Sequence, residues 1–179
     1  EAQRQMTQLS PKKIRTGHLK EFKTAGQKFA CLTSYDHLTA GIFDEAGIEV
    51  LLVGDSAADN FLGYSSTLPI TLEEMISFGR AVASAANRAL VVVDLPFGSS
   101  EGGPQLALES ATSVMKRTGA AAVKLEGGSE RSEQIAKLVS AGIPVMGHLG
   151  FTPQSVHALR GFNVQGRDSS AAERLLADA

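Results

Sequence analysis

Three carboxylates in this chain each come directly after a short apolar run. The pairs are residues 50–54 before Asp55, residues 90–93 before Asp94 and residues 121–125 before Glu126. Apolar, β-branched runs of this kind are typical of buried parallel strands. Because the carboxyl ends of parallel strands meet at one edge of a sheet, we expect the three acids to converge. Converging carboxylates repel one another unless a positive group lies between them, and a hard divalent cation such as Mg²⁺ would supply it.

Lys124 lies two residues before Glu126 on the same predicted strand, so both side chains point to one face. The alternating Val123 and Leu125 point to the other face, which in a barrel meets the helices. Two interpretations of the inward-facing pair remain open. It is either a structural ion pair, which is costly to bury, or a lysine that holds a substrate carboxylate beside a metal.

Further polar residues follow the predicted strands. Ser56 comes after Asp55, and Gly54 lets a ligand approach the backbone closely. Tyr35 ends the first predicted strand and is a possible wall of a pocket. His148 ends the fifth, where a hydrogen-bonded structural histidine is as good an interpretation as an acid, base or ligand. For the two aspartates the plainer alternative is a turn or strand-end residue bonded to local backbone amides.

Other kinds of site lack their signatures. No Cys or His pair has the spacing of zinc ligands, and no Gly-x-Ser-x-Gly elbow supports a serine nucleophile. No Gly-x-Gly-x-x-Gly follows the first strand, which argues against a dinucleotide fold.

The elements that must position these residues alternate along the chain. We expect strands at residues 29–33, 50–53, 90–93, 121–125 and 144–146, and helices at 37–46, 71–86, 104–119, 129–142 and 169–179. Acids at successive strand ends suit a (β/α)₈ barrel, which places its site at that face. Five strands are too few for eight, so residues 1–179 are expected to be a single, incomplete barrel domain that lacks its C-terminal part, with an N-terminal arm over residues 1–28.

Composition narrows the class of protein. The formal net charge of −2 gives no electrostatic case for nucleic acid or an anionic membrane. No apolar run reaches membrane-spanning length, and the polar N-terminus has no signal-peptide block. The single cysteine, Cys31, is interpreted as a small core residue in a reducing cytoplasm.

Six blocks of sequence, in order, resemble one enzyme family. They are TSYD at 33–36, VGDS at 53–56, TLPIT at 67–71, VDLPFG at 93–98, VKLEGG at 123–128 and GHLGFTPQ at 147–154. This arrangement resembles ketopantoate hydroxymethyltransferase, also called 3-methyl-2-oxobutanoate hydroxymethyltransferase. The resemblance runs from about residue 14 to residue 167.

The resemblance implies a (β/α)₈ TIM barrel of the phosphoenolpyruvate/pyruvate-like kind, in a cytoplasmic homo-oligomer that is typically a decamer in bacteria. It implies transfer of a hydroxymethyl group from 5,10-methylenetetrahydrofolate to 3-methyl-2-oxobutanoate. The product is 2-dehydropantoate, made through a Mg²⁺-stabilised enolate on the route to pantothenate and coenzyme A. A 2-oxo acid can chelate Mg²⁺ through its keto and carboxylate oxygens, which agrees with the acids identified above.

Carried over residue by residue, the resemblance makes Asp55, Asp94 and Glu126 the Mg²⁺ ligands. It makes Asp55, Ser56, Asp94 and Lys124 the keto-acid contacts. The family's proton-abstracting glutamate belongs to a region beyond Ala179, so no residue of this chain is expected to be the catalytic base. The sequence departs from the family at Arg160, which precedes Gly161 where a second glycine is common.

Two alternatives remain. The first is another Mg²⁺-dependent 2-oxo-acid lyase or mutase on the same barrel, which would share the metal but not the folate. The second is a binding or assembly module without activity, although an unused buried lysine would be costly to retain.

Overall fold

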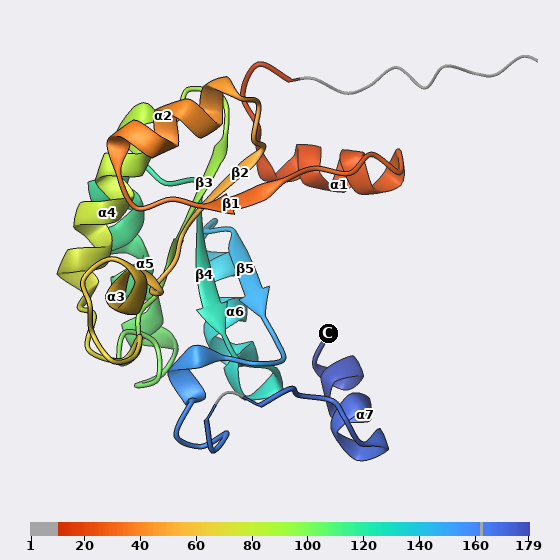
Figure 1. Ribbon diagram of the computed structural model, residues 1–179. Helices are drawn as coiled ribbons and strands as arrows, with labels where there is room; N and C mark the ends of the chain where they lie inside the picture. Colours follow the sequence, from red (N-terminus) through yellow and green to blue (C-terminus); the bar gives the residue numbers. More distant parts are fainter. Residues whose placement is uncertain (1–10, 162) are drawn as a thin grey trace, which may run out of the picture.

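Five parallel strands form one sheet in the computed structural model, which describes residues 11–161 and 163–179. The strands are β1 (Cys31–Thr33), β2 (Val50–Val53), β3 (Leu90–Asp94), β4 (Ala122–Glu126) and β5 (Val145–His148). They lie side by side in sequence order, β1 to β5, and every neighbouring pair is parallel (Figure 1). A doubly wound sheet reverses its strand order at a switch point, whereas this order is that of a barrel wall.

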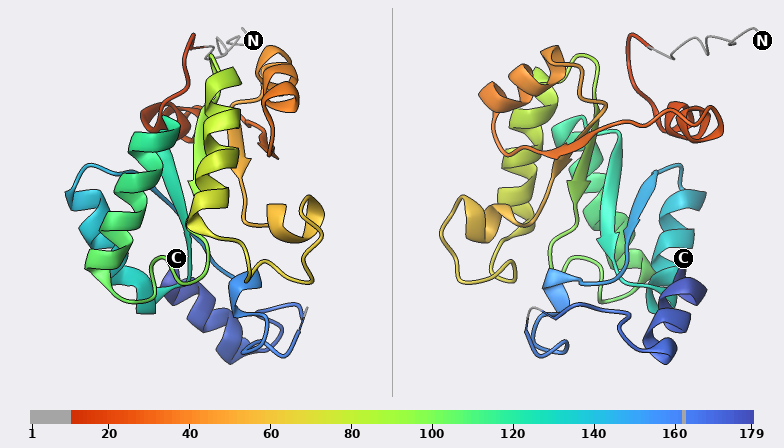
Figure 2. Two further views of the ribbon diagram at one scale, coloured as in Figure 1. Left: turned by 90° about the vertical axis from the view of Figure 1, so that its left-hand side faces the viewer. Right: turned by 45° about the vertical axis from the view of Figure 1, so that its right-hand side comes forward.

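Helices α2 (His37–Glu45), α4 (Leu72–Ala85), α5 (Pro104–Thr118) and α6 (Ser132–Ser140) cover one face of the sheet (Figures 1 and 2). These helices and the five strands were predicted from the sequence, and so was α7 (Ser169–Asp178). The short elements α3 (Ala57–Asn60), η1 (Ser129–Arg131) and η2 (Pro153–Ser155) lie at positions where no separate element was expected. Helix α1 (Thr16–Thr24) lies within the expected N-terminal arm, whose first ten residues are outside the described range.

Residue parity along the strands decides which side chains meet the helices. The odd-numbered residues of β2, β3 and β4, with Val145 of β5, belong to a core cluster with helix residues such as Met75, Val114 and Leu138. The members from the strands are Leu51, Val53, Val91, Val93, Val123, Leu125 and, partly buried, Val145. This alternation follows from the period of two in a β-strand and confirms that Val123 and Leu125 face the helices.

The even-numbered strand residues form the opposite, inner face. Near the strand N-termini this face is apolar, and it packs against Ile14 and Phe22 from the segment that contains α1. The strand residues of this second cluster are Val50, Leu90, Val92 and Ala122. Helix α1 therefore covers the N-terminal end of the inner face, where burial of Phe22 and its neighbours holds it in place.

Local capping signals place the helix starts as predicted. Asp36 accepts a hydrogen bond at Oδ1 from the Thr39 amide, 2.9 Å away, and begins α2. Thr71 and Glu74 form the reciprocal capping box of α4. Helix α5 ends at Thr118, and the next residue, Gly119, has a φ of 79°, the left-handed conformation that favours glycine.

Cys31 departs from its predicted place in the core. Every residue of β1 is exposed, and Cys31 is among them. Among the described residues β1 pairs only with β2, so its other edge and much of its side-chain surface are uncovered. The apolar neighbours of Cys31 in the sequence indicated a strand correctly, but they could not show that the strand lies at an edge.

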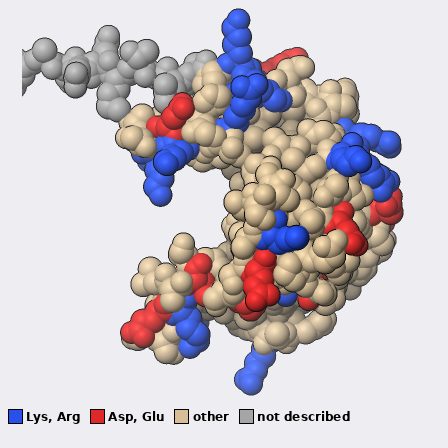
Figure 3. Space-filling model, turned by 180° about the vertical axis from the view of Figure 1, so that it is seen from behind, with Lys and Arg blue, Asp and Glu red and all other residues tan. Residues whose placement is uncertain are grey.

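The molecule is hollowed on the side between α1 and α7, as the space-filling view from behind shows (Figure 3). The five strands and their outer helices thus form part of a barrel wall that curves around this hollow. Among the described residues, no helix combines the length and apolar character that crossing a membrane requires.

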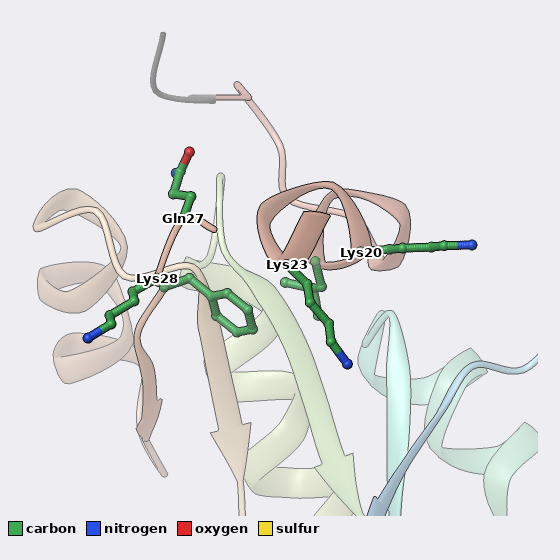
Figure 4. Close-up of a pocket in the computed structure, with 6 residues that line it drawn as sticks. Lys20, Lys23, Gln27 and Lys28 are labelled. Carbon is green, nitrogen blue, oxygen red and sulfur yellow. The ribbon is translucent and has the colours of Figure 1, made fainter. Parts of the chain in front are cut away.

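A pocket of about 640 Å³ lies between α1 and the segment leading into β1. Its lining residues are Leu19, Lys20, Lys23, Gln27, Lys28 and Phe29. The labelled lysine side chains extend in different directions around it (Figure 4). Because these residues precede β1, this pocket lies at the N-terminal end of the sheet, away from the predicted acids.

Candidate metal and substrate site

The carboxylates of Asp55, Asp94 and Glu126 converge at the C-terminal edge of the sheet. One oxygen from each lies within 4.8 Å of the other two, and all three residues are buried. Asp94 ends β3 and Glu126 ends β4, while Asp55 follows β2 by two residues. Three separate strands therefore supply the acids, and the parallel sheet brings them together.

Lys124 lies among these acids and is buried with them. Its Nζ donates to Asp94 Oδ1 and Oδ2, at 2.8 and 2.7 Å, and to Glu126 Oε1 at 3.2 Å. The strand register sets this arrangement, because Lys124 is the direct cross-strand neighbour of Asp94. The ammonium thus supplies part of the positive charge that the acids require, and the structure contains the ion pair that was one of the two interpretations of Lys124.

One ammonium against three carboxylates leaves two negative charges uncompensated when all the acids are ionised. The pKa of Asp55 is raised to about 7, first by burial and then by the charge of Asp94. Burial also raises the pKa of Asp94, although the Lys124 charge acts in the opposite direction. The site therefore has an excess of negative charge that a bound cation would relieve.

Glu126 has hydrogen bonds to more partner residues than either of the other two acids. Besides Lys124, His148 Nδ1 lies 3.0 Å from its Oε1, and the Gln154 amide donates to its Oε2 at 3.1 Å. Burial tends to raise the pKa of Glu126, but the His148 hydrogen bond, the Lys124 charge and the Gln154 amide lower it overall. Burial likewise tends to lower the pKa of Lys124, and the charges of Asp94 and Glu126 raise it overall.

Ser56 and Tyr35 lie beside the acids. The Tyr35 hydroxyl is 2.8 Å from Ser56 Oγ, and its ring packs near Phe61 and Phe78, with centroid distances of 6.2 and 6.4 Å. A Cβ added at Gly54 would lie 3.0 Å from Ser56 Oγ, so the glycine makes room for this hydroxyl. Tyr35 thus fixes the orientation of Ser56 next to Asp55.

Every site residue singled out in the sequence lies in this region, directly or through one intermediary. The acids and Lys124 contact one another, His148 reaches them through Glu126, and Tyr35 reaches Ser56. Gln154 was not singled out, although it belongs to one of the six matching blocks. Its Nε2 donates to Asp55 Oδ2 at 2.8 Å, a contact across 99 residues that no spacing rule reveals.

The donor set suits a hard cation. All three candidate ligand groups offer carboxylate oxygens, which Mg²⁺ prefers over nitrogen or sulfur. Because Mg²⁺ keeps several waters and takes substrate oxygens, two or three protein ligands are sufficient. The residues present therefore fit a divalent cation of this kind.

Comparison with solved structures defines the fold class. The chain superposes on phosphonopyruvate hydrolase, solved in complex with oxalate and Mg²⁺, with a TM-score of 0.61 at 14% identity over 83% of this chain and 55% of that one. It superposes on 2,3-dimethylmalate lyase, a member of the PEP mutase/isocitrate lyase superfamily, with a TM-score of 0.59 at 17% identity over 90% of this chain and 56% of that one. The chain thus has the fold of a partial TIM barrel, as predicted.

Sequence comparison defines the family more narrowly. The family profile described as ketopantoate hydroxymethyltransferase matches residues 13–179, and the chain belongs to this family. It is 61% identical over 170 residues to the 3-methyl-2-oxobutanoate hydroxymethyltransferase of Leifsonia xyli, and 61% identical over 174 residues to that of Corynebacterium efficiens. These alignments cover 95% and 97% of this chain but 61% and 64% of the relatives, so the chain spans about three fifths of their length.

Proposed function

We propose that this chain carries the metal and keto-acid site of a 3-methyl-2-oxobutanoate hydroxymethyltransferase. In this reaction a hydroxymethyl group passes from 5,10-methylenetetrahydrofolate to 3-methyl-2-oxobutanoate and gives 2-dehydropantoate, on the route to pantothenate and coenzyme A. The observation that carries the proposal is the convergence of Asp55, Asp94 and Glu126 around Lys124, in a chain about 60% identical to enzymes of that name.

Asp55, Asp94 and Glu126 would hold Mg²⁺ through their carboxylate oxygens. When bound, the cation supplies positive charge that polarises the keto carbonyl of the 2-oxo acid. The matching of this chain to phosphonopyruvate hydrolase, solved with oxalate and Mg²⁺, supports the choice of cation. Burial of the three acids excludes water and strengthens each electrostatic contact inside the site.

Lys124 and Ser56 would hold the carboxylate of the keto acid. The Lys124 ammonium has three protons, and in this structure it directs them toward Asp94 and Glu126. A substrate carboxylate offers it a further acceptor in place of one of these contacts. Tyr35 orients the Ser56 hydroxyl, which lies one residue from Asp55 and therefore beside the cation ligands.

The proton acceptor is not assigned to a residue of this chain. His148 already bonds to Glu126, which gives it a role in orienting a metal ligand.

By the same family relationship we propose that residues 1–179 are part of a single barrel domain, and that the protein is a cytoplasmic homo-oligomer, a decamer in bacteria.

A panel of 2-oxo acids tests the proposal. In the presence of Mg²⁺, calorimetric titration should show tighter binding of 3-methyl-2-oxobutanoate than of oxaloacetate or phosphonopyruvate. Tighter binding of either competitor would favour the alternative, a lyase or mutase on the same barrel. Absence of binding for all three acids would contradict a keto-acid site altogether.

A further inference from the structure

Gln154 contacts three strand ends at once. It lies in η2, which follows β5, and is 9% exposed. Its Nε2 donates to Asp55 Oδ2 at 2.8 Å and to the Leu95 carbonyl at 3.0 Å, while its backbone amide donates to Glu126 Oε2 at 3.1 Å. These partners follow or end β2, β3 and β4, and lie 99, 59 and 28 residues away in the sequence.

The contact with Asp55 is the one that matters most. Among the described residues, the hydrogen bond that the Asp55 carboxylate accepts comes from Gln154 Nε2. The Lys124 ammonium bonds to Asp94 and Glu126 instead. With Oδ2 held by Gln154, Oδ1 remains available to a cation. Gln154 thus fixes one oxygen of a candidate ligand and leaves the other free.

The orientation of the Gln154 amide is itself determined. A carboxamide nitrogen has two protons, and here both have an acceptor: Asp55 Oδ2 and the Leu95 carbonyl. Rotating the amide by 180° would place its oxygen against two other oxygens. The donor therefore faces Asp55 in a single arrangement, as expected of a group that orients a ligand.

We propose that Gln154 is a positioning residue that holds Asp55 for a divalent cation, while its backbone amide holds Glu126. This inference rests on the proposed function, because it assumes that these acids bind a cation. Removal of an outer-shell partner of this kind typically weakens metal affinity by roughly 10- to 100-fold. A purely structural tie would instead change the folding stability and leave the cation affinity unchanged.

The test measures the Kd for Mn²⁺ by electron paramagnetic resonance, with Mn²⁺ as the probe in place of Mg²⁺. The Gln154→Met variant keeps the length of the side chain and removes its donor. Gln134→Met is the matched control, since Gln134 is also buried and its Nε2 donates to the Ser100 carbonyl, away from the acids. We expect Gln154→Met to weaken Mn²⁺ binding by roughly 10- to 100-fold, and Gln134→Met to change it less than about twofold.

Folding of each variant is followed by urea denaturation. Equal loss of stability in both variants with no difference in Mn²⁺ affinity would overturn the proposal. The Gln154→Asn variant provides a second route, because it keeps a donor that is one methylene too short to reach Asp55, and it should weaken Mn²⁺ binding similarly. If neither variant folds, the unsubstituted protein is titrated with Mg²⁺ and followed by NMR. The ¹⁵N resonance of the Gln154 side-chain amide should shift, and an unchanged resonance would overturn the assignment.

Asp94→Asn separates this inference from the proposed function. If Asp94→Asn abolishes Mn²⁺ binding and Gln154→Met does not weaken it, only the role of Gln154 is wrong. If Asp94→Asn also binds Mn²⁺ like the parent, the metal site itself is wrong.

Discussion

Two buried aspartates lie near opposite ends of strand β3 and have different partners: Asp44, from α2, lies near its N-terminal end, and Asp94 is its last residue. At the N-terminal end, Asp44 accepts hydrogen bonds from the backbone amides of Asn87, Arg88 and Ala89. At the C-terminal end, Asp94 bonds to the Lys124 ammonium and to the Asp55 amide, with two further acids nearby. Asp44 thus joins α2 to the loop before β3 through uncharged donors, whereas Asp94 belongs to a cluster of three carboxylates around one ammonium.

The inner face of the sheet shows the same difference along its length. Near the strand N-termini it is apolar and covered by α1, and near the C-termini its side chains are Asp94, Lys124 and Glu126. Burying charged groups costs desolvation free energy, so apolar residues at the same place generally stabilise a fold as well or better. The two ends of the partial barrel therefore differ in kind: one is an apolar core, and the other is the charged face where this fold usually places its site.

The largest effect is expected from Phe22→Ala, at the apolar end. Phe22 is fully buried, and its loss should lower the free energy of unfolding by about 3–5 kcal/mol. Mg²⁺ affinity of the folded chain should not change. Urea denaturation measures the first quantity, with Phe97→Ala as the control, since Phe97 is 50% exposed in a loop at the other end. A comparable loss of stability in both variants would remove the distinction between the two ends.

Asp94→Asn and Asp44→Asn form the sharpest pair. Asp94→Asn should weaken Mg²⁺ binding by about 100-fold or more, since a ligand matters more than an outer-shell partner. Asp44→Asn should leave Mg²⁺ affinity unchanged and reduce stability by about 1–3 kcal/mol, because backbone donors lose their acceptor. Calorimetry and denaturation measure the two quantities, and the opposite assignment of effects would reverse the roles of the two ends.

Lys124→Met should affect the two ligands in opposite directions. Loss of a charge-assisted hydrogen bond worth about 1.5–3 kcal/mol should weaken 3-methyl-2-oxobutanoate binding by roughly tenfold or more. Without keto acid, Mg²⁺ should bind severalfold more tightly, because the ammonium no longer neutralises Asp94 and Glu126. Calorimetric titration of each ligand alone and together checks this, and parallel weakening of both would contradict the role given to Lys124.

The raised pKa of Asp55, about 7, predicts a pH dependence at the charged end. Mg²⁺ must displace the proton, so its affinity should rise about tenfold per pH unit up to pH 7 and level off above pH 8. Without metal, the stability due to protonated Asp55 is fully present below the unfolded-state pKa and is lost as pH rises through 7. Mg²⁺ titrations between pH 5.5 and 8.5 test this, and a constant Kd would refute it.

The smallest effect concerns the loop after η2, on the site side of the sheet. Arg160 has a φ of 57°, a left-handed conformation that costs a side chain roughly 1–2 kcal/mol. Arg160→Gly should therefore raise the free energy of unfolding by about 0.5–1 kcal/mol, after the entropy that glycine adds to the unfolded chain. Arg167→Gly is the control and should give no gain; equal gains in both would mean that the left-handed backbone is not the cause.

The sequence was sufficient to predict the alternating strands and helices and the convergence of the acids, for a physical reason. Both depend on local patterns, apolar runs and terminal acids, combined with the parallel direction of the strands. Contacts that join distant segments were not predictable: the bond from Gln154 to Asp55, the cover that α1 gives to Val50 and Leu90, and the exposure of Cys31. Each of these depends on tertiary packing, which no period of the sequence encodes.

The most direct test titrates Mg²⁺ into the chain in the presence of 3-methyl-2-oxobutanoate and compares the parent with Asp55→Ala. The parent should bind Mg²⁺ at one site, more tightly with the keto acid than without it, and Asp55→Ala should lose this binding. Equal heats for parent and variant, or no binding by the parent, would contradict a shared cation and keto-acid site at the strand ends.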